Sequence, residues 1–161
     1  MAKQQKPEGV TLYGWQKDII NCIENHAEIR DSEQYQGLAD YSVNRALGIV
    51  VAYPRGSGHT FLANYIASIY PTALIYNKMS DYISVTKTFP LHPATDTIST
   101  FEIYYALHKP DLRMPTPDYL DLRSRFQQKQ VVVVDKGLAV HDDVKNFLYD
   151  VAQGMVIILG H

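Results

Sequence analysis

The chain has 161 residues, of which 46% are hydrophobic and 20% are charged. This length suits one domain, and this apolar fraction excludes a globally disordered chain. Fifteen Lys and Arg residues against seventeen Asp and Glu residues give a formal charge of −2, which excludes a strongly basic coat for nucleic acid but not a local basic patch.

The N-terminal part of the sequence predicts a tail followed by a helix. Residues 1–9 are polar and contain a proline and a glycine, so we expect a flexible tail before a single domain over 10–161. Apolar residues then recur every four positions, which places them on one helix face. These residues are Trp15, Ile19, Ile23 and Ala27. Residues 28–45 are weakly patterned, and only a short helix is expected there.

From residue 48 onward, continuous apolar runs predict strands that are buried on both faces of a sheet. The runs are 48–53, 73–76, 131–134 and 155–159, with a shorter one at 97–100. Helical spacing lies between them: at 61–69, at 101–108 and, through Val144, Phe147, Leu148 and Val151, near the C-terminus. The segment 109–129 contains three prolines and predicts a loop that can end in a helix. Strands alternating with helices predict an α/β fold, a three-layer sandwich with a mainly parallel β-sheet and helices on both faces.

The segment after the first apolar run has the composition of a phosphate-binding turn. Residues 53–60 read Tyr-Pro-Arg-Gly-Ser-Gly-His-Thr, between a predicted strand and a predicted helix. Small residues at Gly56, Ser57 and Gly58 let backbone N–H groups approach an anion, and a helix N-terminus adds positive potential. Thr60 would place its hydroxyl on a magnesium ion. From these eight residues alone, a glycine-rich turn without a ligand is an equally good interpretation.

This stretch resembles the Walker A motif of P-loop NTPases, G-x-x-x-x-G-K-[ST]. Tyr53 stands where the first glycine belongs, and His59 stands where the lysine belongs. The resemblance implies that ATP or ADP binds along the segment that begins at Arg55 and runs through Gly56, Ser57, Gly58, His59 and Thr60.

A second stretch of the sequence makes a nucleotide-binding interpretation of residues 53–60 stronger. Residues 131–136, Val-Val-Val-Val-Asp-Lys, resemble the Walker B motif. In that resemblance Asp135 holds magnesium through water. The next position is usually a glutamate that activates the attacking water, and here it is Lys136.

Three weaker similarities point to one branch of these proteins, the superfamily 2 helicases and the N-terminal ATPase domains of phage large terminases. Residues 12–16 are similar to their upstream glutamine motif, so the resemblance assigns reading of the adenine edge to Gln16. Residues 97–101 resemble the strand-to-helix segment before Walker B, and residues 157–161 resemble the strand that carries the coupling motif. Together the motifs span residue 11 to residue 161 and imply a RecA-like fold.

The departures from both motifs weaken the expected chemistry. A lysine ammonium ~4 Å from a phosphate is worth about 4 kcal/mol at an effective dielectric of ~20, or roughly three orders of magnitude in affinity. His59 is shorter and mostly neutral near pH 7. Without a glutamate at position 136, water activation also suffers. Lys136 follows Asp135 directly, so its ammonium could replace the lost charge; the alternative is that it points to solvent.

The sequence therefore predicts a degenerate P-loop protein with weak or no ATP hydrolysis. We expect it to act as a nucleotide-sensing or structural partner in a phage-type protein or DNA assembly. One alternative is an active ATPase of the helicase or DNA-packaging type that completes its site by oligomerisation, with Arg113, Arg123 or Arg125 serving a neighbouring subunit. Another is an interaction module on the same scaffold that holds no ligand.

A protein partner or a second copy is expected, and nucleic acid is kept as a partner class because the chain has twelve tyrosines, which can stack on bases. Most of these tyrosines suit core or amphipathic positions instead. Residues 141–143, His-Asp-Asp, do not predict a metal centre, because adjacent side chains diverge. Asp142 is better interpreted as the cap or a first-turn acid of a helix over 143–152.

The sequence also predicts where the protein resides. No apolar run approaches the ~20 residues of a membrane helix, and no apolar segment follows the polar start. The single cysteine, Cys22, cannot form an internal disulfide, which is typical of a reducing compartment. We expect a cytoplasmic protein with no membrane partner.

Overall fold

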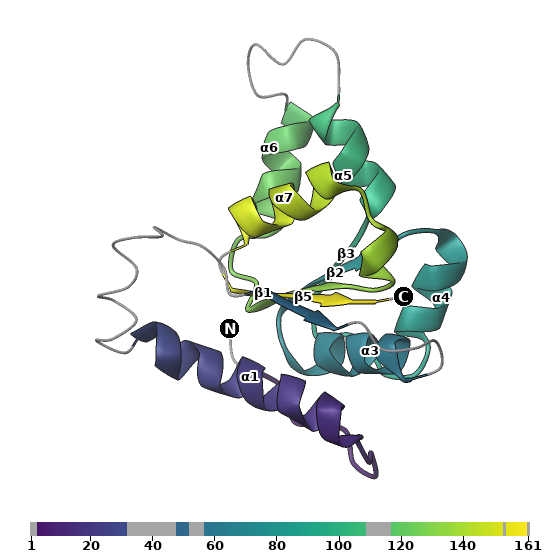
Figure 1. Cartoon of the computed structure of the whole chain (residues 1–161), viewed down its shortest axis with the longest axis vertical. Coiled ribbons are helices and arrows are strands. Elements are labelled where there is room, and N and C mark those ends of the chain that lie inside the picture. The colour runs from purple at the N-terminus through teal and green to yellow at the C-terminus, as the bar shows by residue number, and fades with distance from the viewer. Residues whose placement is uncertain (1–2, 32–47, 52–56, 109–116, 153, 161) are drawn as a thin grey trace.

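In the computed structural model, five parallel strands form one sheet, with helices on both of its faces (Figure 1). The structure describes residues 3–31, 48–51, 57–108, 117–152 and 154–160. The strands are β1 (Gly48–Val51), β2 (Thr72–Tyr76), β3 (Asp96–Ser99), β4 (Val131–Val134) and β5 (Met155–Leu159), in the spatial order β1-β5-β4-β2-β3. The predicted α/β three-layer sandwich with a parallel sheet is confirmed, and all five predicted strands are present.

The helices divide between the two faces of the sheet (Figure 1). On one face lie α1 (Gly14–Asp31), α3 (His59–Ile69) and α4 (Met79–Thr86). On the other lie α5 (Thr100–Leu107), α6 (Pro117–Ser124) and α7 (Asp142–Val151), while a 3₁₀ turn, η1 (Gly137–Ala139), follows β4. The sequence predicted α1, α3, α5 and α7. It allowed a helix near the end of 109–129, whereas α6 ends at Ser124, and it did not predict α4 or η1. In α4 only Asp81 and Val85 are buried, so its apolar period is too weak to recognise.

Each described strand near the centre of the sheet sends alternate side chains into two separate cores. One core joins the sheet to α1 and α3, with strand residues Leu74, Val131, Val133, Met155, Ile157 and Leu159. The other joins the sheet to α5, α6 and α7, with strand residues Ala73, Ile75, Ile98, Val132, Val134, Val156 and Ile158. Because helices cover both faces, every position of β4 and β5 is buried, which explains their continuous apolar sequences.

The described part of the predicted tail is attached to the domain. The backbone N–H of Gln4 donates to the carbonyl of Ile69 at 2.7 Å, and Lys3 Nζ donates to Glu24 Oε1 at 2.8 Å. The hydroxyl of Tyr70 donates to the same carboxylate at 2.6 Å, and these two donors lower the pKa of Glu24. Residues 3 and 4 thus connect α1 with the end of α3.

The start of α7 differs in detail from its prediction. The N-cap is His141, whose Nδ1 accepts from the backbone N–H of Asp143 at 3.1 Å. Asp142 is the first helical residue, so it was correctly predicted as a first-turn acid and wrongly as a cap.

The strand order places a topological switch point between β2 and β4. After β2 the chain enters α4 on the α1–α3 face, whereas after β4 it enters α7 on the opposite face. The two strands are neighbours in the sheet. Parallel α/β sheets bind ligands where adjacent strands diverge in this way, outside their carboxyl ends. The residues directly after β2 and β4 are therefore candidates for a ligand site.

The close packing of Gly154, just before β5, against the backbone of Gln130 gives a test of the fold. A Cβ at Gly154 would lie 2.0 Å from the backbone oxygen of Gln130, whereas a Cβ at Gly14 would have no atom within 4 Å. We expect Gly154→Ala to lower the free energy of unfolding by about 1–3 kcal/mol, because a backbone carbonyl cannot move aside cheaply. Gly14→Ala is the matched control and should leave stability near the wild-type value. Equal stability of the two variants in urea denaturation would contradict this packing.

Candidate functional site

Two residues far apart in the sequence meet at the carboxyl edge of the sheet. Thr60 lies in the first turn of α3, and Asp135 directly follows β4. The Thr60 hydroxyl oxygen lies 3.1 Å from Asp135 Oδ1 and 3.4 Å from Oδ2. They meet because α3 carries the chain from β1 to β2 and so passes beneath β5 and β4. The structure therefore brings together the two residues that the sequence assigned to magnesium.

Asp135 is buried, with 1% of its surface exposed. Burial is the largest influence on its carboxyl and raises its pKa; the hydrogen bond from Thr60 and the nearby charge of Lys136 act in the opposite direction, while the carboxylate of Asp81 raises the pKa further. The net shift is upward, so the ionised carboxylate lacks sufficient positive charge around it. A cation beside Asp135 would supply that charge.

The donor set suits a hard cation that keeps much of its own water. Within the described residues, no group of three or more His, Cys, Asp or Glu side chains is arranged to hold a metal. One carboxylate and one hydroxyl cannot enclose an ion on their own. Mg²⁺ is commonly bound in this way, by one or two protein oxygens with water and phosphate oxygens completing its shell.

The turn that opens α3 is described from Ser57 onward. Gly58 is the N-cap, with a left-handed φ of 90°, and its carbonyl accepts from Leu62 N–H at 3.0 Å. In the described part of this turn no side chain caps the helix, and no acidic residue occupies its first turn. The positive end of the α3 dipole therefore faces no acidic side chain of its own first turn, which suits an anion. Arg55 and Gly56, which were also predicted to bind phosphate, lie outside the described residues.

Gln16 connects α1 to this turn. Its Nε2 donates to the carbonyl of Gly58 at 3.1 Å, and its Oε1 accepts from the backbone N–H of Tyr13 at 2.9 Å. Both ends of the buried amide therefore contact the chain itself. The predicted contact with adenine would have to share an amide that already holds the turn against α1.

His59, at the position of the missing lysine, is buried at the start of α3. Its ring centroid lies 5.4 Å from that of Trp15, with the ring planes tilted by 52°. The side chain is therefore packed beside α1, and its predicted contact with phosphate stays a prediction.

Lys136 has a partner that the sequence did not predict. Its Nζ lies 2.5 Å from Asp81 Oδ1, on the third residue of α4. The sequence left open whether this ammonium meets phosphate or solvent, and the structure places it on a carboxylate. Asp81 gave no recognisable sequence signal beyond its position shortly after a strand, because it lies 55 residues from Lys136.

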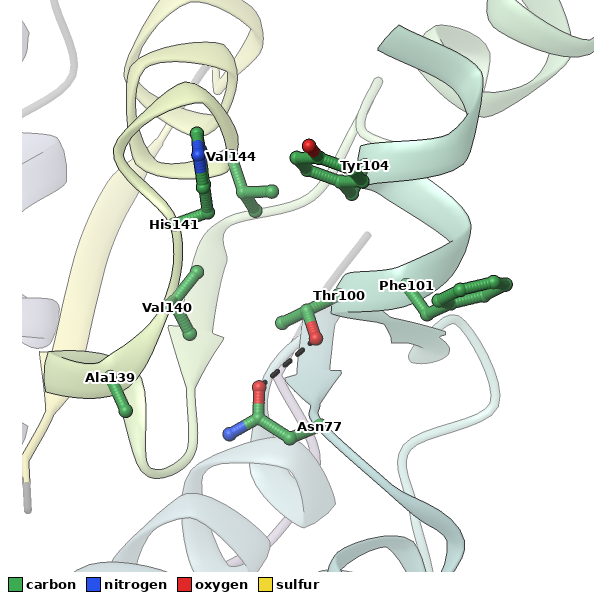
Figure 2. A pocket seen from close by; sticks show the side chains of 8 residues that line it. All are labelled: Asn77, Thr100, Phe101, Tyr104, Ala139, Val140, His141 and Val144. Carbon is green, nitrogen blue, oxygen red and sulfur yellow. Dashed lines mark hydrogen bonds between the residues drawn. The ribbon is translucent and has the colours of Figure 1, made fainter. Parts of the chain in front are cut away.

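A hollow of about 310 Å³ adjoins this edge of the sheet (Figure 2). Figure 2 shows Tyr104 of α5 and His141, which precedes α7, on opposite sides, with Asn77 below them. Asn77 Oδ1 accepts from the Thr100 hydroxyl at 3.0 Å, and its Nδ2 donates to the Lys136 carbonyl at 3.4 Å. The hollow is thus connected to Lys136 through Asn77, a residue that no motif in the sequence singled out.

No protein-family model matches the chain, and no curated protein matches it. Among the described helices, none is both long and apolar enough to cross a membrane. Any functional assignment therefore has to come from this chain's own residues.

The buried charge of Asp135 predicts a gain in stability when it is removed. The pKa of this carboxyl is raised in the folded state, so its contribution to folding stability is fully present below the ordinary aspartate pKa of about 3.9. That stabilising contribution is lost as the pH rises through the pKa of the folded state. At pH 7 we therefore expect Asp135→Asn to melt at a higher temperature than wild type without Mg²⁺, and the difference to shrink toward pH 4. Thermal unfolding between pH 4 and 8 measures this.

The exposed residue Asp18 provides the control. Asp18→Asn should leave the melting temperature nearly unchanged across the same pH range. A melting temperature of Asp135→Asn below wild type at pH 7 would mean that the carboxylate stabilises the fold and would contradict the account of its burial.

The stability cost of crowding between Gly58 and Gln16 can be measured separately from the cost of backbone strain. A Cβ at Gly58 would lie 2.8 Å from Gln16 Nε2, whereas Gly9, with a comparable φ of 73°, has no atom within 4 Å of an added Cβ. Gly9→Ala should cost about 1–2 kcal/mol from the left-handed conformation alone. Gly58→Ala should cost more, and the excess should disappear in a Gln16→Ala background. A constant cost in both backgrounds, measured by chemical denaturation, would contradict the contact.

Proposed function

We propose that the chain is a degenerate P-loop NTPase-like domain that binds Mg²⁺ with ATP or ADP weakly and hydrolyses ATP little or not at all. The observation that carries this proposal is the contact of 3.1 Å between Thr60, at the start of the helix after the glycine-containing turn, and Asp135, at the end of β4. A hydroxyl and a buried carboxylate are the two protein ligands that the Walker A and Walker B resemblances require, and a chance glycine-rich turn has no reason to face such a carboxylate.

The residues present define how such a nucleotide would be held. The first N–H groups of α3 would bind phosphate oxygens, as helix N-termini do. Thr60 and Asp135 would hold Mg²⁺, directly or through water. Bound Mg²⁺ neutralises phosphate charge in sites of this kind. The Thr60 hydroxyl can keep its hydrogen bond to Asp135 when the ion binds, because its oxygen still offers a lone pair. The cation would also compensate the buried negative charge of the Asp135 carboxylate.

The same residues explain why binding should be weak and turnover low. His59 is buried beside Trp15, so it does not supply the charge of the missing lysine in the same manner. Position 136 carries a lysine and therefore no carboxylate that could orient an attacking water. A nucleotide would then act by being bound and not by being hydrolysed. This fits a nucleotide-sensing or structural partner in a protein or DNA assembly of the phage type.

The surface of α5 is compatible with a protein partner. Phe101 is 71% exposed, and Tyr104 and Tyr105 are exposed beside it. Exposed aromatic side chains in one place are typical of interaction surfaces. The two described arginines that could have served a neighbouring subunit are instead close to acids of their own chain, with Arg125 2.7 Å from Glu102 and Arg123 3.9 Å from Asp150. Arg113 lies outside the described residues.

A ligand-free interaction module on this scaffold is the second candidate, and Gln16 favours it. A glutamine that reads adenine needs its amide free to face the base, whereas both ends of this amide contact the chain. The two candidates differ in whether Mg²⁺ and nucleotide bind at all.

Calorimetric titration with ATP and ADP, with and without Mg²⁺, separates them. We expect Mg²⁺-dependent binding with a dissociation constant of about 1 mM, three orders of magnitude weaker than a micromolar site. Thr60→Val and Asp135→Asn should abolish it, and Thr88→Val, at an exposed threonine, should not. Phosphate release should be no faster in wild type than in Asp135→Asn. Binding that survives in Asp135→Asn would contradict the proposed site, and turnover lost in that variant would contradict the degenerate assignment.

A further inference from the structure

The ion pair between Lys136 and Asp81 bridges the switch point of the sheet. Lys136 follows β4, and Asp81 lies in the first turn of α4, which follows the neighbouring strand β2. Lys136 Nζ and Asp81 Oδ1 are 2.5 Å apart. Lys136 has a left-handed backbone, with φ 54° and ψ 41°, which a non-glycine residue adopts only at a cost. The fold therefore fixes the direction of the Cα–Cβ bond of Lys136.

The two partners are not equally fixed. The Asp81 side chain is 4% exposed, and its second oxygen accepts from the backbone N–H of Lys78 at 3.3 Å, which completes the start of α4. The Lys136 side chain is 31% exposed and carries its charge on a flexible four-carbon stem. If the pair opens, the ammonium is the group that moves, since the carboxylate is held by the helix.

The pair lies beside the site that the proposed function assigns to nucleotide. Asp135 precedes Lys136, and the charges of both Lys136 and Asp81 act on the Asp135 carboxyl, with the ammonium lowering its pKa and the carboxylate raising it. A phosphate bound through a cation on Asp135 would therefore stand within the electrostatic range of the same ammonium. Two anions, the Asp81 carboxylate and the phosphate, then compete for one cation.

We propose that Asp81 determines the nucleotide affinity of this site by holding the Lys136 ammonium away from the phosphates. The inference rests on the proposed function and deepens it: the cation lost from the turn is present in the chain but is engaged by a carboxylate of α4. Weak binding then has a specific and removable cause, in addition to the substitution at His59. Asp81 acts through Lys136, so it is a positioning residue.

The matched control is Glu102. It occupies the first turn of α5 as Asp81 occupies the first turn of α4, each helix has eight residues, and Glu102 forms an ion pair of 2.7 Å with Arg125. Glu102→Gln removes one carboxylate and frees one cation, as Asp81→Asn does, but at a different strand end. An effect of net charge alone would appear in both variants.

The experiment measures the dissociation constant of Mg²⁺-ATP by calorimetry for wild type, Asp81→Asn, Glu102→Gln and the double variant Asp81→Asn/Lys136→Met. A freed ammonium near the phosphates is worth up to three orders of magnitude in affinity, and less where water reaches it. We expect Asp81→Asn to bind at least 10-fold more tightly, Glu102→Gln to be unchanged, and the double variant to return to within about 2-fold of wild type. An Asp81→Asn affinity equal to that of wild type overturns the proposal.

The double variant keeps the proposal falsifiable even if Asp81→Asn alone does not fold. It removes both charges, so its local net charge equals that of wild type. Binding 10-fold weaker than wild type would show that the ammonium already contacts phosphate with Asp81 in place, and would overturn the proposal. If wild type and every variant fail to bind up to millimolar concentrations, the proposed function is overturned together with this inference. If wild type binds and Asp81→Asn binds no more tightly, only the inference fails.

Discussion

The candidate site depends on one buried carboxylate. Asp135 sits at the end of a strand that is covered on both faces, and the hydroxyl of Thr60 is its closest described donor from another element. A buried charge with so little compensation costs folding free energy, and proteins keep such groups where a function needs them. The rest of the site can be understood from this residue. It explains why the Thr60 hydroxyl donates to the end of β4 and why the neutral variant should be the more stable one.

Much of the fold could be predicted because strands that are buried on both faces of a sheet have continuous apolar sequences. The runs 131–134 and 155–159 match β4 and β5 residue for residue, since every side chain in them meets a core. α4 was missed because only two of its eight residues are buried. The cap of α7 was misassigned by one residue, because histidine and aspartate both accept hydrogen bonds and local sequence does not distinguish them. The strand order was not predictable at all, since it depends on which helix crosses which strands.

The candidate site was predictable only in part, because its long-range contacts leave no pattern in the local sequence. Thr60 and Asp135 belong to stretches with a recognisable pattern, and the structure brings them together as that pattern implied. The partners of Gln16 and Lys136 had no such signal. Gln16 meets Gly58, 42 residues away, and Lys136 meets Asp81, 55 residues away in the opposite direction along the chain. A pattern identifies residue types at fixed spacing, but it does not reveal which long-range contact already occupies a side chain.

The left-handed lysine at the end of β4 also limits how this site could evolve. Replacing Lys136 by glutamate would place a third carboxylate near Asp135 and Asp81 and would remove the ammonium that pairs with Asp81. Repulsion among the three carboxylates would then destabilise the fold. A glutamate at position 136 would be better tolerated if Asp81 changed first or at the same time, so the residues that each of the two positions can accept depend on one another.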